Sequence, residues 1–511
     1  MNDNYIQEKM NNVNRDNLLK IISDNSDTEF GKKFDFSSIN SIKEYMNRVP
    51  ISDYTDYQNA VDEMFKGKKN VLTAYEIYDY AVTSGSAGKR KVFPVTYEAL
   101  KRYGTHIDER LINLAKDKSS VRLLVSRILS YEDVEKKSPK LLSELYYGYQ
   151  LENNLWPVEQ FVGGKELNFL SRTDSDHLYI KLWLALSSPK IVTLEGIFLY
   201  DLLIFFNYMK GNWRIVISDM ETGRISSSVK ISERSKETLI KMIPSRERLD
   251  SLRREFERGY ENIAKRIFPD IKLISGIGSL PAMTEEILLK RYTGDIPVSH
   301  FCYVSSECHI GVPDKDDSYD YRLLGGSAFF EFRPQDENEE KTLLPMDLTV
   351  GKNYELIITT FCGLYRYATG DIVTVTGFED DSPLIRFKCR RDLMLNVGGE
   401  KVDELTLDSV MRDFKEKTNI NLSGYLAKTD ITQLPGRYEI IVCTDTVTKS
   451  NELPLLFDRL MIKYSRDYED LRNMGSIGMP VIRLCNEEEY RRSRRHLGMD
   501  LGHLKPVHIA L

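Results

Sequence analysis

The sequence has few cysteines, no long apolar run and no excess of basic charge, and each lack excludes a class of protein. Six cysteines in 511 residues are too few for a disulfide framework, and no two CxxC pairs are present to form a zinc ribbon. The most apolar stretch, residues 196–209, is too short to cross a bilayer and contains Asp201. The 71 Lys and Arg against 77 Asp and Glu give a net charge of −6, which argues against a dedicated nucleic-acid binder.

The N-terminus, MNDNYIQEKMNNVNRD, is polar and lacks the apolar segment of a signal peptide. No fixed-period repeat or low-complexity tract is visible. Hydrophobic residues make up 41% of the chain, enough for a large core, and the length predicts roughly two to four domains. We therefore expect a soluble protein of the reducing cytoplasm, with neither a membrane nor a nucleic acid as partner.

Short apolar segments along the chain predict a mixed α/β fold. A helix is predicted over residues 17–24 with Asp16 as its cap, and another over residues 42–48. The charged, periodic segment 249–267 predicts one surface helix. Strands are predicted over eight segments: residues 78–84, 121–126, 191–194, 271–274, 298–304, 328–332, 354–359 and 372–378.

The composition changes near residue 390. The sequence beyond it predicts strands over 393–397, 438–443 and 481–485 and helices over 402–414, 455–471 and 487–496. This pattern is typical of a compact α/β domain of roughly 120 residues. We therefore expect an N-terminal domain over residues 1–389, a C-terminal domain over residues 390–511 and a hinge at about 389–392.

Residues 83–94 (TSGSAGKRKVFP) follow a predicted strand and combine hydroxyl groups, glycines and cations. Glycines let backbone N–H groups approach an anion, and hydroxyl and ammonium groups complete a cradle for phosphate. The GxxxxGK[ST] spacing of a Walker loop is absent. The same composition also suits a flexible Gly/Ser turn, so this pattern alone leaves both interpretations open.

Two carboxylates stand beside predicted strands. Glu307 lies in YVSSECHIG (residues 303–311), where one carboxylate among small hydroxyl residues suits an Mg²⁺ ion that takes other ligands from a triphosphate. Asp371 follows Gly370 at a predicted strand entry, where it is well placed to accept hydrogen bonds from a ribose diol. The alternatives are a solvent-facing loop for Glu307 and a hairpin turn for Asp371.

Two further segments suit the working parts of a two-domain enzyme. Residues 390–404 (RRDLMLNVGGEKVDE) place paired arginines and an aspartate at the predicted domain junction. Lys505 is the only lysine after Lys463, and a lysine on a mobile domain can neutralise charge that builds on a reacting carboxylate and phosphate. An ordinary polar linker and a solvated tail lysine are the alternatives.

The order of these segments resembles that of adenylate-forming enzymes and, more narrowly, the Gretchen-Hagen family of acyl acid–amido synthetases. The resemblance covers nearly the whole chain. Besides residues 83–94 it is carried by WRIVISDMETGRI (213–225), AFFEFRP (328–334), YELIITTFCGLYRYATGDIVTVTGF (354–378) and RNMGSIGMPVIRL (472–484). Residues 354–378 are the most specific segment, because general acyl-CoA ligases do not carry that long form.

The resemblance implies an α/β fold with a large N-terminal adenylate-forming domain of mixed β-sheets and helices and a small, mobile C-terminal α/β domain. It implies a ligase that uses ATP and Mg²⁺ to adenylate a carboxylic acid and then transfers the acyl group to an amine, expected to be an amino acid. The partners implied are therefore the small-molecule acid and amine; the sequence specifies neither their identity nor the oligomeric state.

The resemblance also implies roles for individual residues. Lys505 and Glu307 would be catalytic, with Glu307 near Mg²⁺. Residues of the first loop would line the phosphates and offset their charge, namely Thr83, Ser84, Gly85, Ser86 and Lys91. Tyr303 would contribute to the adenine pocket, Ser305 and Ser306 would lie by the nucleotide and acyl group, Asp371 would bind the ribose, and Arg391 would sit near the nucleotide at the hinge. The amine would lie partly against a segment containing Gly475, Gly478 and Ile482.

The chain departs from the family pattern at three places. Ala87 stands where many members have a hydroxyl, the terminal motif reads HLKPV, and residues 145–215, where relatives form much of the acyl pocket, match poorly. The aromatic residues Tyr146, Tyr147 and Trp156 are candidates for the acyl pocket or for the core.

Two alternative functions remain. One is an acyl-CoA ligase of the same superfamily, in which a thiol replaces the amine; the long segment 354–378 and the lack of a separate basic patch for CoA favour amide formation. The other is an inactive acyl- or nucleotide-binding sensor, against which the joint presence of Glu307, Asp371 and Lys505 argues.

Overall fold

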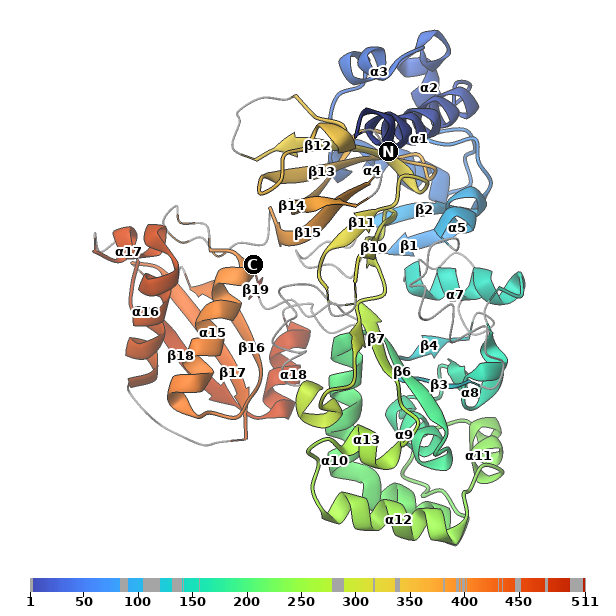
Figure 1. The fold of residues 1–511 in the computed structure, drawn as a ribbon, viewed down its shortest axis with the longest axis vertical. Coiled ribbons are helices and arrows are strands. Elements are labelled where there is room, and N and C mark those ends of the chain that lie inside the picture. The colour runs from blue at the N-terminus through green and yellow to red at the C-terminus, as the bar shows by residue number, and fades with distance from the viewer. Residues whose placement is uncertain are drawn as a thin grey trace.

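A computed structural model provides the fold in Figure 1. It describes residues 3–82, 91–103, 120–130, 140, 142–155, 157–277, 289–315, 318–335, 341–379, 382–391, 395, 397, 400, 402–430, 432–433, 435–445, 452–473, 477–496 and 509–510. The predicted site residues Thr83, Ser84, Gly85, Ser86, Gly475 and Lys505 lie outside the described residues. Within these ranges no helix combines the length and the apolarity needed to cross a membrane.

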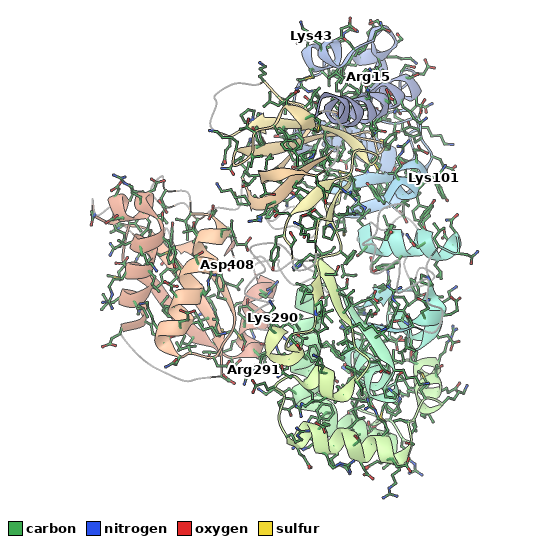
Figure 2. All side chains as sticks on the ribbon, viewed as in Figure 1. Arg15, Lys43, Lys101, Lys290, Arg291 and Asp408 are labelled. Carbon is green, nitrogen blue, oxygen red and sulfur yellow. The ribbon has the colours of Figure 1, made fainter. Side chains whose placement is uncertain are left out.

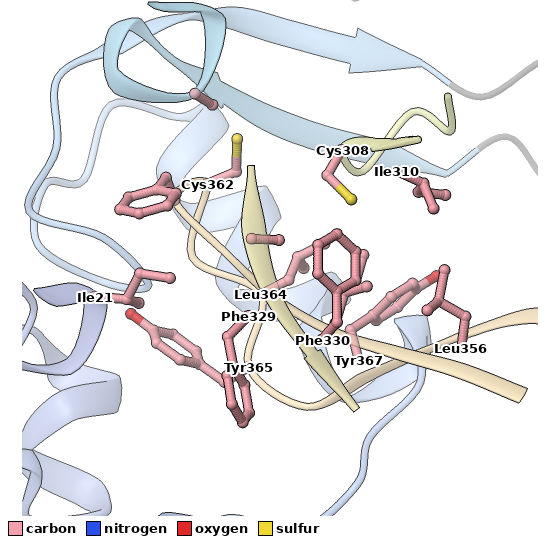
Figure 3. Packing of buried hydrophobic residues seen from close by; sticks show 14 of the residues in the cluster. Ile21, Cys308, Ile310, Phe329, Phe330, Leu356, Cys362, Leu364, Tyr365 and Tyr367 are labelled. Carbon is pink, nitrogen blue, oxygen red and sulfur yellow. The ribbon is translucent and has the colours of Figure 1, made fainter. Parts of the chain in front are cut away.

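A seven-stranded antiparallel sheet forms the upper part of the N-terminal body (Figure 1). Its strand order is β12-β13-β14-β15-β11-β10-β9. The bounds are β9 Tyr303–Val304, β10 His309–Pro313, β11 Tyr321–Leu323, β12 Ala328–Pro334, β13 Asn353–Thr360, β14 Tyr367–Glu379 and β15 Ser382–Arg390. The core of this part contains side chains from several of these strands and from the segments between them, including Phe329, Phe330, Leu356, Leu364 and Tyr365 (Figure 3).

N-terminal helices cover this sheet and bury their apolar faces in the same core. They are α1 Asp3–Asp24, α2 Glu29–Lys33, α3 Ile42–Arg48, α4 Tyr54–Phe65 and the 3₁₀ turn Phe36–Ser38. Asn14 on α1 exchanges hydrogen bonds with the backbone of Phe330, which ties the helix to β12. Exposed charged side chains, Arg15, Lys43 and Lys101 among them, lie on the outer side (Figure 2).

A hairpin of β1 (Ile77–Val82) and β2 (Val92–Thr96) lies beside this sheet and leads into α5 (Tyr97–Tyr103). Val82 pairs with Val92, so the predicted phosphate loop joins two residues that are paired in the hairpin. The backbone of Lys140 bonds both Tyr80 and Val82, and its ammonium group pairs with Asp79 in a buried ion pair. Strand β1, which leads into the predicted phosphate loop, is therefore bonded along both edges, by β2 on one side and by Lys140 on the other.

The lower part of the body is built on a four-stranded parallel sheet in the order β3-β6-β7-β8. Its strands are β3 Val121–Leu124, β6 Ile191–Phe198, β7 Leu273–Ile277 and β8 Val298–Ser299; β4 Ile128–Leu129 and β5 Phe169–Leu170 form a separate parallel pair. The helices are α7 Leu142–Glu152, α8 Gly164–Asn168, α9 His177–Ser187, α10 Leu199–Thr222, α11 Glu233–Ile240, α12 Arg246–Glu257 and α13 Ile263–Ile267, with 3₁₀ turns at Val158–Gln160 and, in the upper part, Pro345–Asp347. Helices α8 to α13 enclose a second hydrophobic core, whereas α7 places Leu145 and Tyr149 in the first.

The C-terminal residues form a third core of their own around a four-stranded sheet in the order β18-β17-β16-β19. The strands are β16 Leu422–Asp430, β17 Arg437–Thr444, β18 Val481–Cys485 and β19 Ile509–Ala510. The helices are α15 Glu404–Thr418, α16 Glu452–Tyr464, α17 Arg466–Asn473 and α18 Glu487–His496. This unit lies at the left of the body in Figure 1.

Several predicted elements are corrected by the structure. Helix α1 runs from Asp3, with Asp16 in its interior, because no glycine or proline interrupts the polar stretch before it. The predicted helix 249–267 is two helices, since Gly259 and Asn262 have positive φ angles of 97° and 53°. The predicted helix 455–471 is also two helices, with the break at Ser465. The Ser465 hydroxyl accepts a hydrogen bond from the Tyr468 N–H and so caps the start of α17.

Two corrections matter for the site. The segment 298–304 is not one strand: β8 belongs to the parallel sheet and β9 to the seven-stranded sheet, so the chain crosses between the sheets just before Tyr303. Strand β14 begins at Tyr367, five residues earlier than predicted, so Asp371 lies inside a strand and not at its entry.

Candidate active site

The seven-stranded sheet is so curved that side chains from distant strands meet. Tyr303 lies on β9 at one edge, and Asp371 lies on β14, third from the other edge. The Tyr303 hydroxyl nevertheless donates a hydrogen bond of 2.8 Å to Asp371 Oδ2. Burial, and then the charge of Asp371, raise the pKa of this hydroxyl far above its usual value, so Tyr303 remains a donor.

Asp371 is 4% exposed and its carboxylate is held from two sides. Besides Tyr303, the Arg390 Nε donates to Asp371 Oδ1 at 2.9 Å. The two residues are directly paired in the β14–β15 register, so their side chains share one face of the sheet. The charge of Asp371 raises the pKa of the Arg390 guanidinium, which outweighs the opposing effect of burial. Asp371 is thus a fixed, negatively charged acceptor.

Glu307 belongs to the same cluster and is 3% exposed, which overturns the alternative of a solvent-facing loop residue. The Ser305 N–H donates to Cys308 O at 3.0 Å, and the Glu307 N–H donates to Ser305 Oγ at 3.3 Å, so a tight turn presents the carboxylate. The Tyr103 hydroxyl also holds this turn, because it donates a hydrogen bond of 3.1 Å to the backbone carbonyl of Glu307. Ser306, which was also predicted to lie at the site, is half-buried in this turn.

The charge balance around Glu307 shows which groups surround it. Burial raises the pKa of Glu307, and the negative charge of Asp371 adds to that effect. The positive charges of Arg390 and Lys91, together with a hydrogen bond to Ser305, act in the opposite direction. Two buried carboxylates and two half-buried cations therefore lie within electrostatic reach of one another.

Lys91 connects the predicted phosphate loop to this cluster. Its Nζ donates to the Tyr367 hydroxyl at 3.3 Å and lies 5.7 and 5.9 Å from the ring centres of Tyr54 and Tyr367. Tyr367 is the first residue of β14, and Asp371 follows on the same strand. The end of the loop is therefore anchored close to the cluster.

Arg391 and Arg390 face different partners. The backbone N–H of Arg391 donates to the carbonyl oxygen of Gly370 at 2.7 Å, whereas the Arg391 side chain pairs with Glu355 on β13. Arg390, which sequence reasoning noted only as half of an arginine pair, is the one that contacts Asp371. Consecutive residues of an extended chain point to opposite faces, so this difference could have been expected if β15 had been predicted up to Arg390.

The predicted amine-binding residues Gly478 and Ile482 lie in the C-terminal domain and not in the cluster. The Gly478 N–H donates to Gly436 O at 2.7 Å, and a Cβ atom at Gly478 would meet Pro435 O at 3.0 Å, so the backbones approach closely here. Ile482 pairs with Ile440 in the parallel β17–β18 ladder and packs against the domain core.

The cluster supplies one carboxylate that could hold a cation. Asp371 is already engaged by Arg390, and within the described ranges no three His, Cys, Asp or Glu side chains are grouped as metal ligands. This donor set fits Mg²⁺ only if oxygen atoms of a bound phosphate complete the coordination, which is how Mg²⁺ is commonly held beside nucleotides. Glu307 is the residue that fits.

Comparisons with known proteins identify the family. The GH3 family N-terminal domain matches residues 4–298, the GH3 family central domain residues 321–390 and the GH3 family C-terminal domain residues 405–510. The chain belongs to the GH3 family. It is 28% identical over 502 residues to indole-3-acetic acid-amido synthetase GH3.4 of Arabidopsis thaliana, covering 92% of this chain and 81% of that protein. It is 27% identical over 531 residues to GH3.2 of the same organism, covering 96% and 94%.

Solved structures agree in fold. GH3.15 acyl acid amido synthetase superposes with a TM-score of 0.84 at 20% identity, over 99% of this GH3 chain and 92% of that one. A 2-hydroxyisobutyryl-CoA ligase gives a TM-score of 0.56 at 10% identity, over 98% and 89%. The family and these relatives confirm the predicted resemblance, the α/β fold of an adenylate-forming enzyme and the class of acyl acid–amido synthetase.

Proposed function

We propose that this GH3 chain is an ATP-dependent ligase that works in two steps. The carboxylate of an acyl acid attacks the α-phosphate of ATP, which yields an acyl adenylate and pyrophosphate. An amine, in our proposal that of an amino acid, then attacks the acyl carbonyl and releases AMP. The observation that supports this most is a cluster in which the buried carboxylates of Glu307 and Asp371 lie near the half-buried cations of Arg390 and Lys91.

Each group in the cluster has a proposed task. Asp371, held by Tyr303 and Arg390, accepts hydrogen bonds from the ribose diol, and Tyr303 borders the adenine. Lys91 and the loop with Thr83, Ser84, Gly85 and Ser86 offset the charge of the phosphates. Ser305 and Ser306 lie beside the nucleotide and acyl group. Preorganised charges in a buried site stabilise a transition state without reorientation during the reaction.

Glu307 would hold Mg²⁺ together with phosphate oxygens of ATP. When bound, the ion reduces repulsion between the two reacting anions and polarises the phosphoryl group. The raised pKa of Glu307 fits a carboxylate that binds a cation in competition with a proton.

The C-terminal domain completes the proposal. We assign residues 1–389 to an adenylation domain and residues 390–511 to a mobile domain that carries Lys505. Lys505 would neutralise charge on the reacting carboxylate and phosphate, and rotation about a hinge at 389–392 would then admit the amine. Gly475, Gly478 and Ile482 would border the amine, for which correct orientation supplies much of the rate advantage.

The acyl acid that we propose is apolar and aromatic. The relatives named above carry indole-3-acetic acid in their names, and a GH3.15 structure is described in complex with 2,4-DB. In this chain Tyr147, Phe161 and Phe198 belong to a small hydrophobic cluster that includes residues near the carboxyl ends of the parallel strands, the usual ligand-binding edge of such sheets. The composition supports a cytoplasmic location.

A pyrophosphate-exchange screen tests this function. With Mg²⁺ and ATP, exchange should appear with an apolar aryl or indole acid and not without acid. Adding amino acids should then yield an amide and AMP. A thioester formed with CoA, and no amide with any amino acid, would favour the acyl-CoA ligase. Absence of exchange with all aryl, indole and fatty acids would favour a binding sensor.

A further inference from the structure

Arg390 is the last residue of β15 and Arg391 follows it, and each is held by a carboxylate on a different face of the seven-stranded sheet. Arg390 pairs with Asp371 on the face that carries the active-site cluster. Glu355 pairs in register with Ile372, the residue after Asp371, so its side chain lies on the opposite face. Arg391 reaches Glu355 on that opposite face.

Glu355 is shared between two arginines. Arg333, its register partner on β12, donates from Nε to Glu355 Oε2 at 2.8 Å. Arg391 donates to the same oxygen from beyond the end of β15. The other oxygen, Oε1, is buried and accepts no hydrogen bond from the part of the chain that the structure describes.

Burial of Glu355 makes it costly to separate Arg391 from this carboxylate. The Glu355 side chain is 2% exposed, whereas the Arg391 side chain is 47% exposed. A buried carboxylate whose charge is offset by cations becomes costly when one of them leaves. Arg391 could be solvated on its own, and it is Glu355 that keeps it in place.

We propose that Glu355 is a positioning residue that fixes Arg391, so that the chain leaves the sheet towards the C-terminal domain from one defined point beside the nucleotide site. The connection to that site is short: the Arg391 N–H donates to Gly370 O, and Gly370 precedes Asp371. The catalytic consequence rests on the proposed function, but the structural one does not.

Limited trypsin digestion of the full-length protein tests the structural part. Trypsin cleaves after an arginine only when that side chain enters the protease, which pairing with Glu355 prevents. In Glu355→Gln, cleavage after Arg391, followed by the mass of the 391-residue fragment, should be at least about fivefold faster. The matched control is Asp320→Asn, which removes the partner of Arg386 on the same strand.

Two outcomes would overturn the positioning role. One is an unchanged cleavage rate after Arg391 in Glu355→Gln. The other is an equal increase in Asp320→Asn, which would indicate general loosening of the sheet. Neither outcome depends on whether the protein makes an adenylate, so failure here is distinguishable from failure of the proposed function.

Kinetics test the catalytic part, and Arg391→Gln serves if Glu355→Gln does not fold. Both variants should lower kcat of amide formation about tenfold, because small displacements of reacting groups are costly, while KM for ATP stays within twofold. A KM for ATP raised tenfold in Arg391→Gln, with kcat unchanged, would make Arg391 a nucleotide contact and overturn the proposal. Loss of pyrophosphate exchange in the parent protein would instead reject the proposed function.

Discussion

The N-terminal body and the C-terminal domain hold their buried carboxylates in different ways. In the seven-stranded sheet the partners are arginines: Asp371 with Arg390, Glu331 with Arg366, and Glu355 with Arg333 and Arg391. In the C-terminal domain each of three buried carboxylates accepts from a tyrosine hydroxyl: Asp408 from Tyr425, Glu400 from Tyr438 at 2.6 Å and Asp458 from Tyr468 at 2.7 Å.

The difference follows from what each donor supplies. A guanidinium group stays charged at any accessible pH and fixes carboxylate geometry through several donors. Arg366 is the fullest case, since it donates to Glu331 and also to Met46 O and Val49 O. A tyrosine supplies one hydrogen bond and no charge, and burial raises the pKa of Tyr468 so that it stays protonated. An arginine holds all three of these carboxylates in the sheet, whereas Asp458 of the C-terminal domain has both kinds of partner, because it also accepts from Arg472 at 2.7 Å.

The largest effect is expected from Asp371→Asn. The substitution leaves Arg390 without its counter-charge and replaces the proposed ribose acceptor, so ATP–pyrophosphate exchange should fall about 100-fold. Tyr303→Phe is the control, because it keeps the Asp371–Arg390 pair and removes only one donor. Exchange within threefold of the parent in Asp371→Asn would show that this charge is not used in adenylation.

Glu331→Gln should have the largest effect on stability. Arg366 is 5% exposed, so loss of the opposing charge leaves a buried cation and should lower the free energy of unfolding by about 3–5 kcal/mol. Urea denaturation measures it. Asp320→Asn, which breaks a pair whose arginine is 39% exposed, should cost no more than about 1 kcal/mol.

Tyr468→Phe tests the other side of the comparison. It removes one neutral donor from Asp458, which retains Arg472 at 2.7 Å, so unfolding should become easier by only about 1–2 kcal/mol. Pyrophosphate exchange with the same acid should stay close to that of the parent. A loss of stability as large as that in Glu331→Gln would abolish the distinction between the two regions.

The smallest effect is a shift in pH dependence at Glu307, whose pKa is raised above 4.5 mainly by burial. Because the folded state holds this proton more tightly than the unfolded state, the stability that the proton contributes is present at low pH and is lost as pH rises through the raised pKa. Adenylation needs the deprotonated form and should decline on acidification with a midpoint above 4.5.

Added Mg²⁺ should move that midpoint to lower pH, since cation and proton compete for one carboxylate. The measurement is pyrophosphate exchange against pH at two Mg²⁺ concentrations. In Glu307→Gln the Mg²⁺-dependent shift should disappear. A midpoint that does not respond to Mg²⁺ in the parent would remove Glu307 as the proposed ligand.

Local patterns in the sequence predicted much of the framework. Helices 42–48 and 487–496 and strand 481–485 have the predicted bounds. Helix 487–496 also carries two i, i+4 ion pairs, Glu487–Arg491 and Glu488–Arg492. Strands β10, β11, β15 and β16 were not predicted. Burial alternates along most of β15, whereas β10 is buried over four consecutive residues and β16 follows no regular pattern. Which residues are buried depends on the neighbouring elements that cover each strand, and a single sequence does not display those.

The residue types at the site were set by the sequence itself: a hydroxyl-rich turn with Glu307, an aspartate after Gly370 and a pair of arginines. Only the tertiary structure decided which arginine meets Asp371, that Glu307 is buried, and that Tyr303 and Asp371 touch. The physical reason is that residue chemistry is carried by each position alone, whereas burial and pairing of charges depend on sheet curvature and strand register, which arise from contacts between segments far apart in the chain.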